Sequence, residues 1–120
     1  MTFGYEKLEV AKIAKGLITD IYKISGQFPN EERYGLVSQL RRAIVSVLLN
    51  IAEGSGRKTP KDFAKFVRIS IGSLIEVHAA LQCAIELEYM EEWRYEKMEP
   101  AMQELYFKLI GLEKYLLNKS

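Results

Sequence analysis

The sequence has few of the residues that carry covalent chemistry or build metal sites. Its 120 residues include one cysteine, Cys83, and one histidine, His78. A single cysteine excludes a disulfide within the chain and favours a reducing compartment. One histidine cannot make a zinc site alone, and the paired Glu-x-x-His motifs of di-iron bundles are absent. We therefore expect no cofactor and a buried, small apolar role for Cys83, with a metal shared between subunits as the alternative left open.

Long apolar runs and a strong net charge are also lacking. Uncharged stretches such as 43–52 and 69–75 fall well short of the roughly 20 residues that span a membrane. The first residues carry charges throughout, without the apolar core of a signal peptide. The net charge is +1, so an electrostatic partner would have to recognise a local patch. We expect a cytoplasmic protein with no membrane partner, folded as a single domain over residues 1–120.

The apolar residues that are present recur at helical spacing almost everywhere. They predict four helices, over about 5–24, about 30–54, about 59–88 and from about 91 onward. Asn30 is the expected cap of the second helix, and Thr59 with Pro60 that of the third. Pro100 should kink the fourth helix or mark its true start. The expected fold is all-α, an antiparallel up-down-up-down four-helix bundle.

Two of these helices carry too little charge for a monomer. Residues 43–52 contain none, and apart from Cys83 the only ionisable side chains between Ile69 and Ile85 are Glu76 and His78. Each helix of an isolated bundle should show a charged outer face. The third helix instead has a second stripe of mostly small residues, which needs a cover, so we predict a homo-oligomer. This stripe comprises Ile69, Gly72, Ser73, Ala80, Cys83 and Leu87.

The segment NIAEGSGRKTPKDF, residues 50–63, connects the second and third helices. It invites comparison with the Walker A loop, G-x-x-x-x-G-K-[ST], but Ile51 replaces the first glycine and Arg57 replaces the lysine. A helix also precedes it, where a nucleotide-binding loop follows a strand. We interpret it as a helix–helix corner in which Gly54 and Gly56 cap and turn the chain through positive φ angles.

Cations gather in this corner and in the residues that follow it. Arg57, Lys58, Lys61, Lys65 and Arg68 stand against Asp62, a local balance of 5 − 1 = +4. Lys61, Lys65 and Arg68 follow at i, i+4 and i+7 and share one helical face. This pattern favours a surface that contacts nucleic-acid phosphates, with a solvated helix face as the alternative. Residues 86–104 are acidic, with a balance of 2 − 7 = −5, and could bind another protein.

Isolated polar residues in the second and third helices predict a structural network that fixes helix register. A carboxylate among small residues could serve as a general acid, but pairing with arginine and hydrogen bonding is the favoured role. We find no constellation that recommends catalysis and predict no catalytic residue, so the protein is not expected to be an enzyme. The network residues are Arg41, Arg42, Ser46, Asn50, Glu53, Ser73 and Glu76.

Three segments together resemble a known family. They are FPNEERYGLVSQLRRA (28–43), SVLLNIAEGSGRKTPKDFAKF (46–66) and GSLIEVHAALQCA (72–84). They resemble the four-helix-bundle proteins encoded in intervening sequences of bacterial 23S ribosomal RNA genes, the S23 ribosomal protein family. The resemblance implies an antiparallel bundle that assembles as a pentameric ring, and it supplies no enzyme activity.

That family is also similar to the accessory variability protein of diversity-generating retroelements. This relative is a pentamer whose basic surface engages nucleic acid and a reverse transcriptase, although a net charge of +1 is low for that role. We therefore expect a non-enzymatic oligomer that binds structured RNA or DNA through the face beginning at Arg57. The alternative is a protein–protein adaptor with no nucleic-acid role.

Overall fold

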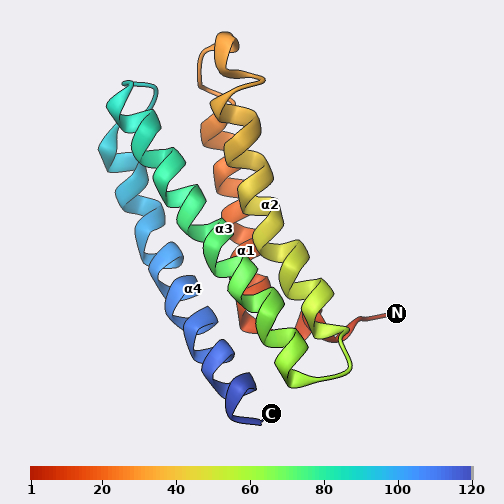
Figure 1. Ribbon diagram of the computed structural model, residues 1–120. Coiled ribbons are helices and arrows are strands. Elements are labelled where there is room, and N and C mark those ends of the chain that lie inside the picture. Colours follow the sequence, from red (N-terminus) through yellow and green to blue (C-terminus); the bar gives the residue numbers. More distant parts are fainter. Residues whose placement is uncertain (120) are drawn as a thin grey trace.

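The computed structural model describes residues 1–119, which form helices and no strands. Four long helices make up most of the chain, and a short 3-10 turn precedes each of the first two (Figure 1). The prediction of an all-helical chain with four helices is confirmed. The elements in chain order are η1 (Gly4–Lys7), α1 (Glu9–Ser25), η2 (Asn30–Glu32), α2 (Leu36–Ser55), α3 (Pro60–Glu86) and α4 (Glu92–Lys119).

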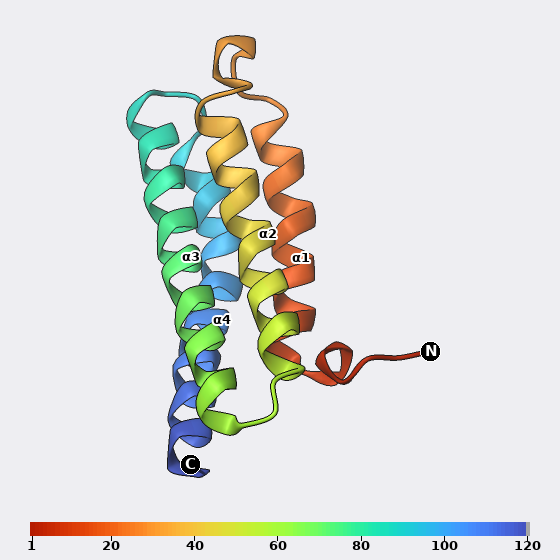
Figure 2. The ribbon, with the colours of Figure 1, turned by 45° about the vertical axis from the view of Figure 1, so that its right-hand side comes forward.

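Each long helix packs on two others. α1 contacts α2 and α4, and α3 contacts the same two helices, whereas α1 and α3 lie diagonally and do not touch. Along α2 and α3, Gln39 lies beside Glu76 and Gly54 lies beside Phe66. One end of the molecule therefore holds η2 and the α3–α4 turn. The opposite end holds the α2–α3 connection, with both chain termini toward it (Figures 1 and 2).

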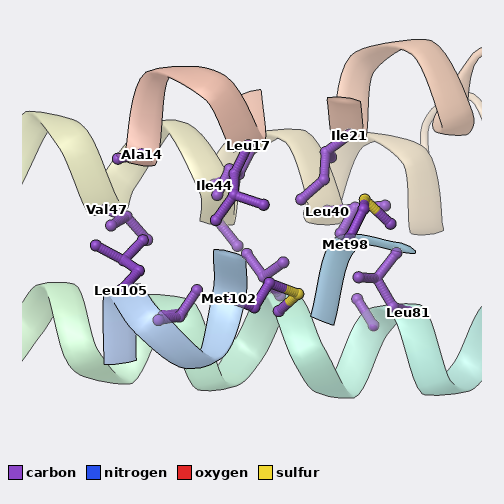
Figure 3. Close-up of a cluster of buried hydrophobic side chains, with 14 of the residues drawn as sticks. Ala14, Leu17, Ile21, Leu40, Ile44, Val47, Leu81, Met98, Met102 and Leu105 are labelled. Carbon is purple, nitrogen blue, oxygen red and sulfur yellow. The ribbon is translucent and has the colours of Figure 1, made fainter. Parts of the chain in front are cut away.

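The core lies along the axis between the four helices, where aliphatic and methionine side chains meet (Figure 3). Burying one such side chain contributes about 1.5–3 kcal/mol, so this core is the main source of stability. Two serines, Ser25 and Ser70, are buried as well, and the fully buried hydroxyl of Ser70 donates to the Val47 carbonyl oxygen at 2.8 Å. Labelled core residues in Figure 3 are Ala14, Leu17, Ile21, Leu40, Ile44, Val47, Leu81, Met98, Met102 and Leu105.

The α2–α3 connection confirms the predicted helix cap and corrects the predicted role of the glycines. The Thr59 hydroxyl oxygen accepts the amide of Asp62 at 3.1 Å, and Pro60 is the first residue of α3. No glycine in residues 1–119 has a positive φ. Gly54 lies in the last turn of α2, where a Cβ would sit 2.7 Å from Phe66 Cβ and 2.8 Å from Phe63 Cδ1. Close helix packing, rather than a turn, is what requires this glycine.

α2 begins later than predicted. Asn30 opens the separate turn η2, and α2 starts at Leu36, whose amide donates to the Glu32 carboxylate at 3.1 Å. The Tyr89 hydroxyl, from the α3–α4 turn, also donates to Glu32, at 2.8 Å. The Leu36 amide and the Tyr89 hydroxyl together lower the pKa of the Glu32 carboxyl. Tyr34 therefore precedes the helix and is 88% exposed, although the helix predicted over about 30–54 would have included it.

Smaller corrections concern α1 and α4. The first helix was predicted to begin at about residue 5, but Tyr5 belongs to η1 and α1 begins at Glu9. Pro100 lies inside α4, which starts at Glu92 as the sequence suggested. Because Pro100 is on the solvent side, water can satisfy the carbonyl that its missing amide leaves unpaired.

The small-residue stripe of α3 divides between the core and the surface. Ala80 is buried within the chain, whereas Ile69, Leu87 and Cys83 are exposed, so the prediction of a buried Cys83 is wrong for the single chain. The reason is geometric, since no other helix of the described chain covers Ile69, Cys83 and Leu87, whereas Ser73 of the same stripe contacts Ser46 on α2. α3 is also long and apolar enough to cross a membrane, but core helices share this property and α3 contributes nine buried residues.

Candidate functional site

The cations predicted to form a basic face do lie on the exposed surface where α3 begins. We call this surface, made of Arg57, Lys58, Lys61, Lys65 and Arg68, the basic corner. Arg57 and Lys58 are in the connection, and the other three follow on the first turns of α3. The positive end of the α3 helix dipole points at the same place, which favours anionic groups there.

Three of the five cations of the basic corner form ion pairs with carboxylates. Arg57 Nη2 lies 3.0 Å from Glu53 Oε1, and its guanidinium stacks 4.5 Å from the centre of the Phe66 ring. Arg68 makes a two-pronged contact with Glu113 of α4, with Nε at 2.8 Å from Oε2. This hydrogen-bonded carboxylate raises the pKa of Arg68. Lys65 Nζ lies a loose 3.7 Å from Asp62.

The contacts reduce the charge that the corner can offer to a ligand. Glu53 and Glu113 add two negative charges to Asp62, so the balance becomes 5 − 3 = +2 instead of +4. Lys58 and Lys61 are exposed, and among the described residues neither has an ion pair or a hydrogen bond from its ammonium group. Glu113 is far along the sequence, so local counting could not have found it.

A polar seam runs along the junction of α2 and α3. The hydroxyl oxygens of Ser46 and Ser73 lie 2.9 Å apart, and Asn50 Nδ2 donates to the Ser46 hydroxyl at 3.0 Å and to its carbonyl at 2.9 Å. Further along the seam, Gln39 Nε2 donates weakly to Glu76 at 3.4 Å. These contacts tie the two helices together at matched positions, which is what fixing their register requires.

The remaining residues of the predicted network lie elsewhere or lack the expected partner. Arg41 points to the α1 side of α2, and Glu53 pairs with Arg57 at the corner. Glu76 contacts Gln39 and not an arginine. Arg42 is exposed and lines the same hollow as Glu76, between the start of α2 and the middle of α3. Sequence reasoning missed Gln39, although its i+7 relation to Ser46 placed it on that face.

The seam has no visible means of activating a hydroxyl for catalysis. Ser46 and Ser73 contact each other and Asn50, none of which is a general base. His78 lies on the other side of α3, where its ring meets Tyr95 edge-on at 5.5 Å. Among residues 1–119 no three His, Cys, Asp or Glu side chains are grouped to hold a metal ion.

A groove between α3 and α4 was not predicted. It has a volume of about 390 Å³ and a largely apolar and aromatic lining, in which Ile75 and Phe107 are exposed. Glu99 also lines it, and Glu92 and Glu96 precede Glu99 at helical spacing on α4. Burial of Tyr95, with Glu99 nearby, raises the pKa of that phenol.

Comparison with known proteins identifies the family. Residues 6–111 match the family described as 23S rRNA-intervening sequence protein. The chain belongs to this family. Among solved structures, a protein of unknown function from the S23 ribosomal protein family of Bacteroides thetaiotaomicron VPI-5482 superimposes with a TM-score of 0.79 at 23% identity. The match covers 88% of this chain and 98% of that one, so the two share their fold. No curated protein matches the chain.

Proposed function

We propose that this intervening sequence protein is a non-enzymatic, antiparallel helical bundle that assembles into a homo-oligomeric ring, a pentamer, and binds structured RNA or DNA. The observation that carries the binding role is the pair of exposed, unpaired ammonium groups of Lys58 and Lys61 at the start of α3. They extend from a rigid helix end whose dipole favours phosphate, and Lys65 is held only loosely beside them.

Assembly is supported by apolar side chains that the chain leaves uncovered around α3. Leu49, Ile69, Ile75 and Leu87 are each at least half exposed, and no other part of the described chain covers them. Neighbouring subunits are the simplest cover. A ring would repeat the basic corner once per subunit, so weak phosphate contacts would act together on one nucleic acid.

Fluorescence anisotropy tests the proposal directly. A labelled RNA hairpin and a duplex DNA of equal length are titrated at low and near-physiological salt, with the assembly mass measured on the same sample. A plot of the logarithm of the binding constant against the logarithm of the salt concentration gives a slope that grows with the number of phosphate contacts. If Lys58 and Lys61 each contact one phosphate of duplex DNA, this slope should be smaller by about two in the variant Lys58→Glu/Lys61→Glu. Binding by this variant at the wild-type level would refute the basic corner as the site.

A matched control reverses two other exposed lysines, Lys12→Glu/Lys15→Glu. Both are on α1, which lies diagonally from α3 and does not contact it. The control changes the net charge by the same amount and should retain most of the binding. Equal losses in both variants would mean that overall charge, and not the corner, governs association.

The α3–α4 groove favours a second candidate function, that of an adaptor for another protein, which could be a reverse transcriptase. Exposed Ile75 and Phe107 beside Glu99 suit an amphipathic helix that carries apolar and basic residues. If no nucleic acid binds at low salt, the variant Phe107→Asp distinguishes this candidate. Wild-type protein should capture a partner protein from an extract of the source cells, and the Phe107→Asp variant should not.

A further inference from the structure

A second cationic surface lies at the opposite end of the bundle from the basic corner. It is formed by the end of α1, the residues after η2 and the first turns of α2 (Figure 1). A shallow hollow of about 400 Å³ opens there, and no carboxylate lines it. We call it the arginine–tyrosine surface; its lining residues are Tyr22, Arg33, Tyr34, Val37, Ser38, Arg41, Arg42 and Val45.

The aromatic rings of this surface are available to a ligand. Tyr34 is 88% exposed and Tyr22 is 41% exposed. The Arg33 guanidinium carbon lies 5.7 Å from the centre of the Tyr34 ring, and that of Arg41 lies 4.5 Å from the centre of the Tyr22 ring. Each ring therefore has a positive charge over one face and solvent-exposed surface elsewhere, an arrangement that suits a stacked base next to its phosphate.

The arginines divide into one that is fixed and two that are free. Arg41 Nε donates to the buried Ser25 hydroxyl at 2.9 Å and Nη2 donates to the Tyr22 carbonyl oxygen at 3.1 Å. Its position is therefore set by the end of α1. Arg33 and Arg42 are exposed, and in the described chain no carboxylate pairs with either. The planar guanidinium groups of Arg33 and Arg42 are therefore free to bind phosphate.

The carboxylates nearest in sequence to Arg33, Glu31 and Glu32, form no ion pair with these arginines in the described chain. Glu32 is occupied by the Leu36 amide and the Tyr89 hydroxyl. The adjoining hollow, also lined by Tyr34, Ser38 and Arg42, contains Glu76, which accepts a weak hydrogen bond from Gln39. Over both hollows the balance is 3 − 1 = +2.

Another exposed aromatic with cations nearby shows why the surroundings matter. Arg94 and Lys97 lie over the Trp93 ring, each at 4.9 Å. The Trp93 indole, however, donates to Glu91, and Glu92 and Glu96 flank the same stretch of α4. A phosphate approaching Trp93 would meet this acidic segment, whereas one approaching Tyr34 meets arginines.

We propose that the arginine–tyrosine surface binds unpaired nucleotides of an RNA, with bases stacked on Tyr34 and Tyr22 and phosphates held by Arg33 and Arg42. This inference rests on the proposed nucleic-acid role and extends it. The basic corner recognises only phosphate charge, whereas this surface distinguishes unpaired from paired nucleotides, because a paired base cannot expose its ring face.

The test compares two probes of equal charge: a fluorescein-labelled oligouridine and a fully paired RNA duplex with the same number of phosphates. Loss of one stacking ring should weaken oligouridine binding by roughly tenfold in Tyr34→Ala and leave duplex binding unchanged. Tyr34→Phe keeps the ring and should restore binding. Because Tyr34 precedes α2 and is almost fully exposed, neither change should affect folding, which circular dichroism checks.

A control variant tests whether any exposed tyrosine beside a cation would bind oligouridine equally well. Tyr115 on α4 is 58% exposed and lies 5.1 Å from Lys119 Nζ, so Tyr115→Ala removes a similar pair and should bind oligouridine as wild type does.

The double variant Arg33→Gln/Arg42→Gln tests the phosphate contacts. The slope of the logarithm of the oligouridine binding constant against the logarithm of the salt concentration should be smaller by about 1.4, because each lost contact with a single strand removes about 0.7.

The outcomes are distinct. If Tyr34→Ala binds oligouridine normally while Lys58→Glu/Lys61→Glu weakens duplex binding, the inference fails and the proposed function stands. If the Tyr34 and arginine variants change the assembly mass and not RNA binding, the surface is a subunit contact and the inference is overturned. If wild-type protein binds neither probe at low salt, both proposals fail together.

Discussion

The two cationic surfaces of this protein hold their charges in different ways. At the basic corner, carboxylates from the same chain pair with Arg57, Lys65 and Arg68. At the arginine–tyrosine surface, Arg33 and Arg41 lie over tyrosine rings, and Arg42 has no carboxylate partner in the described chain. An aromatic ring below an arginine leaves the positive charge of the arginine available to a ligand, whereas a carboxylate neutralises that charge. The surface with fewer cations can therefore offer as much charge to a ligand.

The largest expected effect comes from disturbing the packing that positions the corner. Gly54→Ala would place a Cβ against Phe66 and Phe63, both closer than 3 Å, so we expect a loss of about 1–3 kcal/mol in the free energy of unfolding. Urea denaturation measures it. Gly16→Ala on α1 is the matched control, because nothing lies within 4 Å of the added methyl group; it should be neutral or stabilising by up to about 1 kcal/mol. Equal stability of the two variants would contradict the close packing described for Gly54.

Releasing the paired arginines should make the corner the stronger of the two surfaces. Glu53→Gln/Glu113→Gln keeps hydrogen-bond acceptors but removes two charges, restoring a local balance of 5 − 1 = +4. We expect roughly tenfold tighter binding of duplex DNA at low salt, measured by anisotropy, with the gain fading as salt rises. The control Glu9→Gln/Glu104→Gln removes two carboxylates that pair with Lys108, away from α3. A gain of the same size in the control would show that net charge alone is responsible.

Arg41 should matter for stability more than its neighbour Arg42. Arg41→Lys loses the fork that reaches both Ser25 and the Tyr22 carbonyl, which should cost about 1 kcal/mol in thermal or urea unfolding. Arg42→Lys breaks no hydrogen bond or ion pair and should change stability by less than about 0.5 kcal/mol. If Arg42→Lys were the more damaging change, Arg42 would have a structural partner and could not be reserved for a ligand.

The smallest effect concerns pH and the end of the bundle near Arg33. The Leu36 amide and the Tyr89 hydroxyl lower the pKa of Glu32 in the folded state. The stabilisation by Glu32 is therefore present above its unfolded pKa and is lost as pH falls through the folded value. The difference in stability between wild type and Glu32→Gln should shrink as the pH falls below about 4.5, the ordinary pKa of a free glutamate. A difference that persists at pH 3 would mean that the carboxylate charge is not what holds this end together.

Much of the fold was predictable because it depends on local periodicity. Helix number, the cap at Thr59 and Pro60, and the core residues all follow from spacing along the chain. The start of α2 was not predictable, because Glu32 in the turn before it is bound by Tyr89, which is distant from it in sequence. The role of Gly54 likewise depends on how closely α3 approaches, which no local pattern records.

The candidate sites were predictable only in part, for the same reason. Counting charges located the basic corner but missed Glu113, which lies 45 residues beyond Arg68. The arginine–tyrosine surface is assembled from α1, the residues after η2 and α2, so none of its segments is notable alone. Arg41 and Arg42 are adjacent in sequence, yet α2 directs one toward α1 and leaves the other free.

Both termini of the chain lie toward the end of the bundle that holds the basic corner, whereas the arginine–tyrosine surface lies at the far end (Figure 2). Any polypeptide fused to either terminus would be tethered beside the corner, at a high effective concentration for whatever binds there. In an assembly with its bundles aligned, such attachments would crowd a single rim. A purification tag would therefore bias measurements on the corner and leave the distal surface unobstructed, so tag-free protein is the proper material for comparing the two.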